Sequence, residues 1–483
     1  MTRWVQMGVF SPVLRPHCAG KGGNQRDIWR FDWPAFLVMR DYFRLRARLV
    51  PYLATAQRIA YETGVVPVHP LYYSFPGAPL AYGSLGLHQH SFGPDVWVAP
   101  VTSPAPAGGA GLSRSEIWFP PGTWIEWFSW QAHTAPAPSG AVFGRRFALA
   151  EAPVFSPAGA IVPLRTLPGS GARTGEGDAV GTAVDVPDAI TLWVFPPPPG
   201  SLQPGAELSF STRLYDDDGV SVAYATSDAY GWTNISCSWS RAELVAVDSS
   251  DSSFDPVAQD SVHCSIRPGG GNGFAEMPTA RSWTLRFIST WPPAGVTVGG
   301  VSAIVVQEAV PDAWGDNAAW PTGASASTPV WAYAGGQAST WLHAGAPSPV
   351  DAALEIELTF PSGALADDPL LTSAIARKIA RGQAAKHVLN AVGAAVAADA
   401  RGVLRVARTG AVVEAAIAGA YAGDGAFNSE SVDSMVDAVR TAYADLGDAL
   451  HSALDDVNGL ENLGMRGSPA VESMRALLTN ALE

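Results

Sequence analysis

Residues 3–17 of the sequence read RWVQMGVFSPVLRPH. The stretch brings together an aromatic ring at Trp4, a cation at Arg15 and an imidazole at His17. Aromatic rings stack on the faces of sugar rings, and Arg and His side chains donate charge-assisted hydrogen bonds to hydroxyl groups. Carbohydrate sites use these residue types, but the signal is weak by itself, because a single Arg-x-His pair is more often structural.

The sequence after this stretch predicts a helix followed by extended chain. Apolar side chains recur at helical spacing from residue 35 to residue 63, and Pro51 should kink or split the helix. After Gly64 we expect an extended segment over residues 65–73, so that a boundary falls near residue 70.

Two β-rich regions come next. Short β-type runs separated by Pro and Gly occupy residues 90–165. A Gly-, Pro- and Thr-rich stretch at 167–188 separates them from further short strands that continue to about residue 360. The sequence YDDDG at 215–219 predicts a hairpin turn, because Asp and Gly tolerate positive φ.

Beyond residue 361 the sequence is Ala-rich, and its spacing predicts three or four helices. One candidate helix covers residues 371–400 and ends at Gly402. Another begins at Ser468 and Pro469, with Glu472 near the positive end of the helix dipole.

Composition and charge exclude several classes of protein. Asp and Glu outnumber Lys and Arg by 44 to 30, and the formal charge of -14 repels polyphosphates, so nucleic acid is a poor candidate partner. No apolar stretch reaches the roughly 18 residues of a membrane-spanning helix, and no secretory signal is recognisable, so we expect no membrane span. The compartment stays unassigned.

The cysteines and the acidic turn point to neither a disulfide framework nor a metal. The sequence has 3 Cys and no C-x-x-C spacing. Cys237 and Cys264 fall in one β-rich region and could pair, but we expect them to be small buried apolar residues. Asp216, Asp217 and Asp218 lack the spacing of an EF-hand loop, so we predict a hairpin there, with no metal and no cofactor.

Residues 3–17 resemble a motif of glycoside hydrolase family 31, in which R-W-x-Q-x-G-x-F-S-P is followed by R-x-H. Further stretches resemble the same family in the expected order, at residues 42–53, 63–71, 92–101, 119–124, 152–163 and 215–224. The resemblance covers residues 3–225 by motif and extends to about residue 360 by position.

The resemblance implies a mixed α/β multidomain fold. Residues 1–70 would be the C-terminal fragment of a (β/α)8 TIM barrel, and residues 71–165 and 166–360 would be two antiparallel β-sandwich domains. The Ala-rich helical segment at 361–483 completes the expected domain order.

Family 31 enzymes cleave α-glycosidic bonds with retention, using one Asp as nucleophile and another as general acid/base. In the family both Asp residues precede the R-W-x-Q motif, which begins here at Arg3, so we expect this sequence to hold neither. The resemblance assigns His17 to hydrogen bonding of the sugar in the subsite being cleaved, with Arg15 beside the same pocket.

Local acids offer no obvious replacement for the missing carboxylates. Those in the first 100 residues are Asp27, Asp32, Asp41, Glu62 and Asp95. We expect none to be catalytic, because active carboxylates of barrels lie at strand C-terminal ends. The Trp-rich segment 118–130 could form a sugar-stacking platform, but we expect it in a β-domain core, where aromatic rings dominate packing.

The favoured hypothesis is a retaining α-glycosidase, with α-glucosidase as the expected activity, that hydrolyses O-glycosyl bonds of an α-linked glucoside or related oligosaccharide. This chain by itself is expected to be inactive. One alternative is a noncatalytic carbohydrate-binding or interaction protein built from the β-domains. Another is a nonfunctional fragment whose partial barrel exposes apolar surface.

Overall fold

The structure of the chain is a computed structural model. The structure describes residues 1–17, 26–106, 111–167, 186–243, 259–306, 327–334, 339–360, 364–365, 377–379, 381–386, 388–389, 401–406, 408–409, 412, 429–460 and 468–482.

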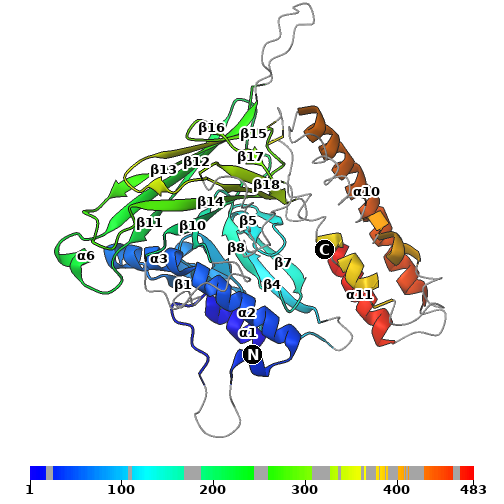
Figure 1. Cartoon of the computed structure of the whole chain (residues 1–483). Coiled ribbons are helices and arrows are strands. Elements are labelled where there is room, and N and C mark those ends of the chain that lie inside the picture. Colours follow the sequence, from blue (N-terminus) through cyan, green and yellow to red (C-terminus); the bar gives the residue numbers. More distant parts are fainter. Residues whose placement is uncertain are drawn as a thin grey trace, which may run out of the picture.

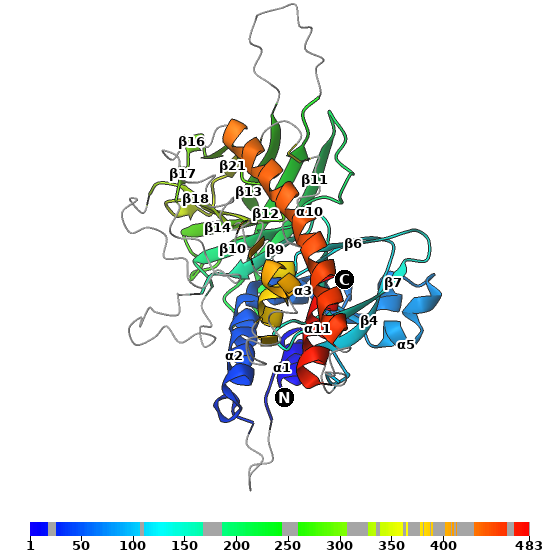
Figure 2. The same ribbon diagram turned by 90° about the vertical axis from the view of Figure 1, so that its right-hand side faces the viewer.

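The sheets form the centre of the molecule, with helices on their flanks (Figure 1). The N-terminal helices lie against the first strands, and the later strands form a larger sheet assembly beside them. The C-terminal helices α10 (Ser429–Gly459) and α11 (Pro469–Leu482) lie along one side, as Figures 1 and 2 both show. Among the described helices, none combines the length and the apolar character that a membrane crossing requires.

Three helices open the chain: α1 (Thr2–Val9), α2 (Trp33–Arg48) and α3 (Val50–Thr63). The Asp32 side chain accepts a hydrogen bond from the backbone N of Ala35, which caps α2. Pro51 stands in the first turn of α3, and Gly64 ends that helix with a φ of 78°. The prediction of a helical region split at Pro51 is therefore confirmed.

The segment after α3 differs in part from the prediction. Strand β1 (Val68–Pro70) is extended, but Leu71–Ser74 form the short helix α4, so the prediction of extended chain as far as residue 73 is wrong. The helical turn buries Leu71 completely in a core with Trp97 and Trp118. This burial outweighs the local preference of Tyr for strands.

The first sheet has the order β1-β2-β3-β8-β5-β6, and β4 pairs with β7 in a separate two-stranded ribbon. All of these described pairs are antiparallel. The strands are β2 (His90–Phe92), β3 (Val96–Val98), β4 (Ser113–Phe119), β5 (Gly122–Glu126), β6 (Ala132–Ala135), β7 (Ala141–Phe147) and β8 (Val154–Pro157). Short helical turns η1 (Ile28–Arg30), η2 (Pro79–Ala81) and α5 (Ser84–Leu87) occupy the connections.

Two larger sheets follow. One has the order β17-β18-β19-β14-β10-β9, with β20 also paired to β14, and the other has the order β11-β12-β13-β21-β15-β16. Their strands are β9 (Ile161–Arg165), β10 (Ala189–Val194), β11 (Glu207–Asp216), β12 (Gly231–Ser240), β13 (Asp260–Gly270), β14 (Ala280–Ile288), β15 (Gly295–Val298), β16 (Val301–Ser302), β17 (Ile304–Val305), β18 (Val330–Ala334), β19 (Ser339–His343), β20 (Ser348–Pro349) and β21 (Leu354–Phe360).

The expectation of purely antiparallel sheets is wrong for the first of these two. β10 runs parallel to β14, and β17 runs parallel to β18. The β11–β13 meander leaves this sheet and returns to it, and a strand that returns after such an excursion is free to pair in parallel. The two sheets share one core, in which Trp239, Leu285, Trp331 and Ile356 are buried.

Cys237 and Cys264 form a disulfide, so the expectation of two unpaired buried cysteines is wrong. They lie directly opposite each other on β12 and β13, with their Cα atoms 4.1 Å apart. The strand register, which sequence spacing alone does not reveal, brings the two thiols together.

The predicted hairpin after Asp216 is confirmed, although its connection is longer than a tight turn. β11 and β12 pair antiparallel from Asp216 opposite Gly231 to Glu207 opposite Ser240. The connection includes Gly219 with a φ of 64° and the short helix α6 (Ala223–Thr226).

The C-terminal predictions have mixed outcomes. Helix α11 begins at Pro469 with Glu472 in its first turn, as predicted. Of the helix predicted over 371–400, residues 377–379, 381–386 and 388–389 are helical, and the remainder lies outside the described residues. Gly402 does not end a helix, because it lies inside a helical stretch at 401–406, where its lack of a side chain allows close approach to Ala453. The predicted break at 167–188 also falls largely outside the described part.

The C-terminal helices are attached to the ribbon of β4 and β7. The Arg381 guanidinium pairs with the Glu151 carboxylate at 2.6 Å, and both side chains are largely buried. The Asn480 side chain donates a hydrogen bond to the backbone O of Arg146 at 3.1 Å and accepts one from Arg381 at 2.7 Å. Ala148 packs against the helical core. The described helices are therefore docked on the β-region by buried polar and apolar contacts.

The link between the first sheet and the second is short and tightly held. The backbone N of Ala158 donates to Thr123 O of β5 at 2.9 Å, and that of Gly159 donates to Pro196 O beyond β10 at 2.8 Å. Gly159 has a φ of 83°, and any Cβ there would overlap the Phe210 ring of β11.

Candidate functional site

The front half of the motif at residues 3–17 lies in α1 and contacts the loop after β7. The Arg3 guanidinium donates hydrogen bonds to the backbone O of Phe147, Ala148 and Glu151. The Gln6 amide donates to Leu149 O at 2.7 Å. Burial lowers the pKa of Arg3, while Tyr42 and Glu151 oppose that shift. Arg3 and Gln6 therefore attach α1 to the end of β7 and to the loop after it.

The back half of the motif is exposed. Arg15 and His17 lie on one irregular segment after α1, and both side chains are open to solvent. Arg46 of α2 fixes the start of this segment by donating hydrogen bonds to the backbone O of Val9, Ser11 and Pro12 at 2.8, 2.6 and 2.7 Å. The two predicted site residues thus lie on one surface segment whose start, at residues 9–12, is fixed to α2 by Arg46.

Large aromatic side chains are exposed on the same group of helices. Trp4 of α1, Trp29 of η1 and Trp33 of α2 are 62%, 71% and 68% exposed. Exposed rings of this size mark surfaces that contact a partner or a ligand.

Most of the local acids serve local structure. Asp27 pairs with Arg30, Asp32 caps α2, Asp41 pairs with Arg40 and Glu62 pairs with Arg58. Asp95 differs, because burial raises the pKa of its carboxyl to about 7. Its backbone N donates a hydrogen bond to the Tyr52 hydroxyl at 2.8 Å, which holds the turn before β3 against α3.

The Trp-rich segment is core, as predicted. Trp118, Trp124, Trp127 and Trp130 are each at most 8% exposed. Trp127 donates a hydrogen bond to the Ser156 hydroxyl at 2.8 Å and packs edge-on against Trp193. Trp130 also packs against Trp193, so these two rings join the first sheet to the second, whereas Trp118 and Trp124 pack on Trp97 of β3.

The acidic turn after β11 is also committed to structure. Asp216 pairs with the buried Arg281 at 2.8 Å, Asp217 accepts a hydrogen bond from the Tyr215 hydroxyl at 2.9 Å, and Asp218 accepts from the backbone N of Ser221. Within the described ranges, no group of three His, Cys, Asp or Glu side chains is arranged to hold a metal ion.

The Tyr residues of this turn attach it to α3. The Arg58 guanidinium lies over the rings of Tyr215 and Tyr230, 5.0 and 4.4 Å from their centroids. Tyr61 of α3 meets Tyr224 edge-on at 5.7 Å. The turn resembling the family's distal motif therefore fastens the larger sheets to the N-terminal helices.

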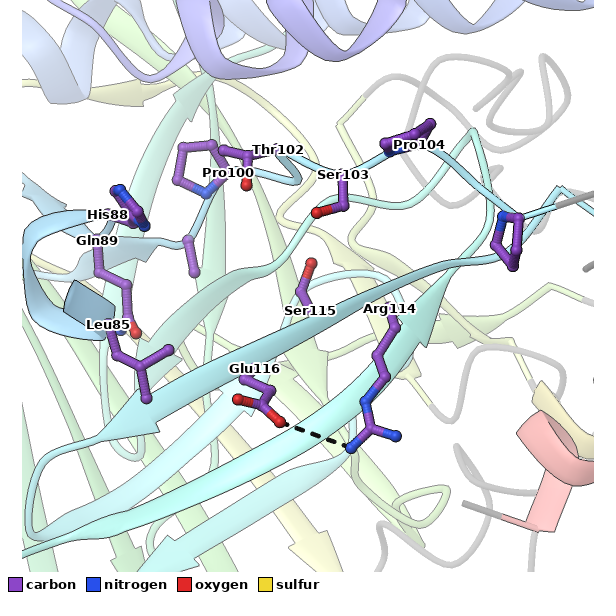
Figure 3. Close-up of a pocket in the computed structure, with 12 residues that line it drawn as sticks. Leu85, His88, Gln89, Pro100, Thr102, Ser103, Pro104, Arg114, Ser115 and Glu116 are labelled. Atoms are coloured by element: carbon purple, nitrogen blue, oxygen red, sulfur yellow. Dashed lines mark ion pairs between the residues drawn. The ribbon is translucent and has the colours of Figure 1, made fainter.

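A polar pocket of about 420 Å³ lies between α5, the chain at residues 99–106 and β4 (Figure 3). We call it the β4 pocket. Its polar lining comes from His88, Thr102, Ser103, Arg114, Ser115 and Glu116. No local motif marks it, because three separate segments supply the lining, so it could not be predicted from the sequence.

Comparison with known families matches the first third of the chain. Residues 1–56 match the glycosyl hydrolases family 31 TIM-barrel domain, and residues 64–162 match the glycosyl hydrolase family 31 C-terminal domain.

Curated relatives come from the same family. "Alpha-glucosidase 2" of Bacillus thermoamyloliquefaciens is 25% identical over 53% of this chain and 28% of its own length. An alpha-xylosidase of Saccharolobus solfataricus is 27% identical over 47% of this chain and 26% of its own length. The chain thus spans about a quarter of the length of these relatives.

Solved structures show the same fold. A GH31 dextranase of Flavobacterium johnsoniae, solved in complex with isomaltotriose, superposes with a TM-score of 0.54 at 20% identity over 74% of this chain and 37% of its own. Helices and mixed sheets follow one another in this chain as in a family 31 fold. From these matches, residues 1–56 and 64–162 of the chain resemble the TIM-barrel and C-terminal domains of glycosyl hydrolase family 31.

Proposed function

We propose that the chain acts as the C-terminal section of a retaining α-glycosidase, most specifically an α-glucosidase, whose catalytic Asp pair lies on barrel segments outside these 483 residues. The observation that carries the proposal is the division of the motif at residues 3–17. Arg3 and Gln6 donate hydrogen bonds to backbone carbonyls inside the protein. Arg15 and His17 are exposed to solvent on a segment whose start is bonded to Arg46. The relatives named α-glucosidase and α-xylosidase support the substrate class.

The proposed chemistry divides between this chain and the missing segments. A retaining glycosidase forms and then hydrolyses a covalent glycosyl intermediate, with two carboxyl groups as nucleophile and acid/base. His17 and Arg15 would donate hydrogen bonds to the hydroxyls of the sugar being cleaved and so fix its ring against the nucleophile. We assign no catalytic carboxylate to this chain.

The domain division belongs to the same proposal. We divide the chain into a barrel end at 1–70, sandwich domains at 71–165 and 166–360, and a helical segment at 361–483. The ends of the family matches, at residues 56 and 162, support the first two boundaries. The exposed rings of Trp4, Trp29 and Trp33 support a barrel end, because remaining barrel elements would cover them.

The test is hydrolysis of p-nitrophenyl α-glucoside by three proteins: the 483-residue chain, a chain extended upstream by the family's barrel segments, and the extended chain carrying His17→Ala. We expect the short chain to be inactive, the extended chain to turn over, and His17→Ala to lower kcat/KM by roughly 100-fold or more. Asp41→Asn in the extended chain is the matched surface control. Turnover by the short chain would refute the assignment of its catalytic carboxylates to other segments.

A second candidate is a noncatalytic carbohydrate-binding protein built from the β-sheets. The β4 pocket favours it, because that pocket uses no residue of the N-terminal helices. This candidate predicts glycan affinity without turnover in both the short and the extended chain.

A further inference from the structure

We propose that the β4 pocket is an accessory site for a neutral sugar unit of a glycan, separate from the segment that carries Arg15 and His17. Such a site is compatible with either candidate function, because binding there requires no catalytic group.

The pocket is built before any ligand arrives. Gln89, which follows α5 and is only 3% exposed, donates a hydrogen bond from its amide to Trp118 O and accepts one from Trp118 N, both at 2.9 Å. These two hydrogen bonds fix the α5 side of the pocket against β4. A site whose walls are already fixed loses little conformational entropy on binding.

A charged pair lies on the β4 wall of the pocket. Arg114 and Glu116 are paired at 3.7 Å, with side chains 62% and 57% exposed, so both keep free hydrogen-bonding capacity. Gly144 of β7 lies opposite Glu116, and a Cβ at that position would come within 2.9 Å of the Arg114 guanidinium. The absence of a side chain at Gly144 therefore leaves the space that Arg114 occupies.

The lining fits hydroxyl groups better than ions. A phosphate would meet the Glu116 carboxylate and a cation would meet the Arg114 guanidinium, so neither ion gains from the pair as a whole. A sugar hydroxyl both donates and accepts, and it can use the two partners together. Figure 3 shows the hydroxyls of Ser103 and Ser115 approaching each other from opposite walls, which adds further donors and acceptors.

The apolar part of the lining suits the carbon faces of a sugar. Leu85, Ala99 and Pro100 lie among the polar groups. A volume of about 420 Å³ falls within the range of small-molecule pockets and leaves room for one or two sugar rings. The pocket therefore offers shape, hydrogen bonds and apolar contact for a short neutral saccharide.

The experiment is titration of the full chain with maltotriose, followed by calorimetry, with inorganic phosphate as the second probe. We expect weak, saturable maltotriose binding that Arg114→Gln lowers about 10-fold or more. Gly144→Ala keeps the charge but displaces the guanidinium, and we expect a smaller loss. Arg267→Gln is the matched control, because Arg267 pairs with Glu355 at 2.7 Å on another sheet and is similarly exposed.

Three results would overturn the proposal. The first is no saturable maltotriose binding at concentrations up to about 50 mM. The second is binding that His17→Ala abolishes while Arg114→Gln leaves it unchanged, because this places the sugar at the N-terminal helices. The third is displacement of maltotriose by inorganic phosphate. The proposed glycosidase function would instead be refuted by the absence of turnover in the extended chain. Failure of the pocket proposal and failure of the glycosidase proposal are therefore distinguishable.

Discussion

The two halves of the motif at residues 3–17 have opposite environments. Arg3 and Gln6 donate their hydrogen bonds to backbone carbonyls of the loop after β7, whereas Arg15 and His17 face solvent. One short stretch of sequence therefore contains a structural half and an open half. A single motif can therefore combine side chains that are fixed by internal hydrogen bonds with side chains that remain open to solvent, and burial separates the two groups.

The structural half continues into a wider network. The loop that accepts hydrogen bonds from Arg3 also carries Glu151, whose carboxylate pairs with Arg381 of the C-terminal helical region and lies 3.7 Å from Arg145. Burial by itself would raise the pKa of Glu151, but Arg145, Arg381 and the hydrogen bond from Ala148 N together lower it. The loop is thus a junction of the N-terminal helices, the β4–β7 ribbon and the C-terminal helices.

The strongest test of the structural half is Glu151→Ala. The substitution leaves Arg381 and Arg145 buried without this carboxylate, and we expect it to lower the free energy of unfolding by about 3–5 kcal/mol. Because the pKa of Glu151 is lowered in the fold, its stabilisation is present above pH 4.5 and is lost as the pH falls through the folded pKa. Urea denaturation at neutral and acidic pH measures both effects.

Asp41→Ala is the matched control for that experiment. Asp41 also pairs with an Arg, at 2.7 Å, but on an exposed face. We expect its loss to change stability by less than about 1 kcal/mol. Equal effects at Glu151 and Asp41 would contradict the view that the loop is a buried junction.

Asp95→Asn tests the opposite effect of burial from that at Glu151. The pKa of Glu151 is lowered by its Arg partners, whereas burial raises the pKa of Asp95. Burial raises the pKa of Asp95 from 3.8 to about 7, so its favourable contribution to stability is present below pH 3.8 and is lost as the pH rises through 7. We expect Asp95→Asn to stabilise the protein by about 2–4 kcal/mol near pH 8 and to have little effect near pH 4. Thermal unfolding across this pH range measures the difference, and a variant less stable at both ends would show that the carboxylate has a favourable partner.

The smallest effect on stability is expected in the open half. His17→Ala and Arg15→Ala should each change the free energy of unfolding by less than about 0.5 kcal/mol, because exposed side chains contribute little to folding. Chemical denaturation of both variants beside Arg3→Ala measures this. A large loss at His17 would place it with the structural half.

Local signals located two helix ends and one helix start correctly, but they missed α4 and misplaced a helix end at Gly402. Pro51 and Gly64 act on their own backbone, through a fixed φ and a left-handed cap, so the split and the end of the N-terminal helical region could be located from sequence. Pro469 and Glu472 located the start of α11 for the same reason. The burial of the Trp-rich segment followed from side-chain size alone.

Features that depend on strand register or on distant segments could not be predicted. The Cys237–Cys264 disulfide requires β12 and β13 to pair in one register, and the spacing of the two residues does not encode it. The β4 pocket depends on the contact of Gln89 with Trp118 and on the space above Gly144. The roles of Arg3 and Gln6 were hidden because their partners are backbone carbonyls, which any sequence supplies.

The link at residues 158–160 has a mechanical consequence. Its amides donate hydrogen bonds on both sides of the link, and a side chain at Gly159 would overlap Phe210, so the backbone there is poorly suited to act as a hinge. We therefore expect the first and second sheets to move together at this link. Relative motion within the described part is therefore expected in the loops and helices that surround these two sheets and not at the link between them.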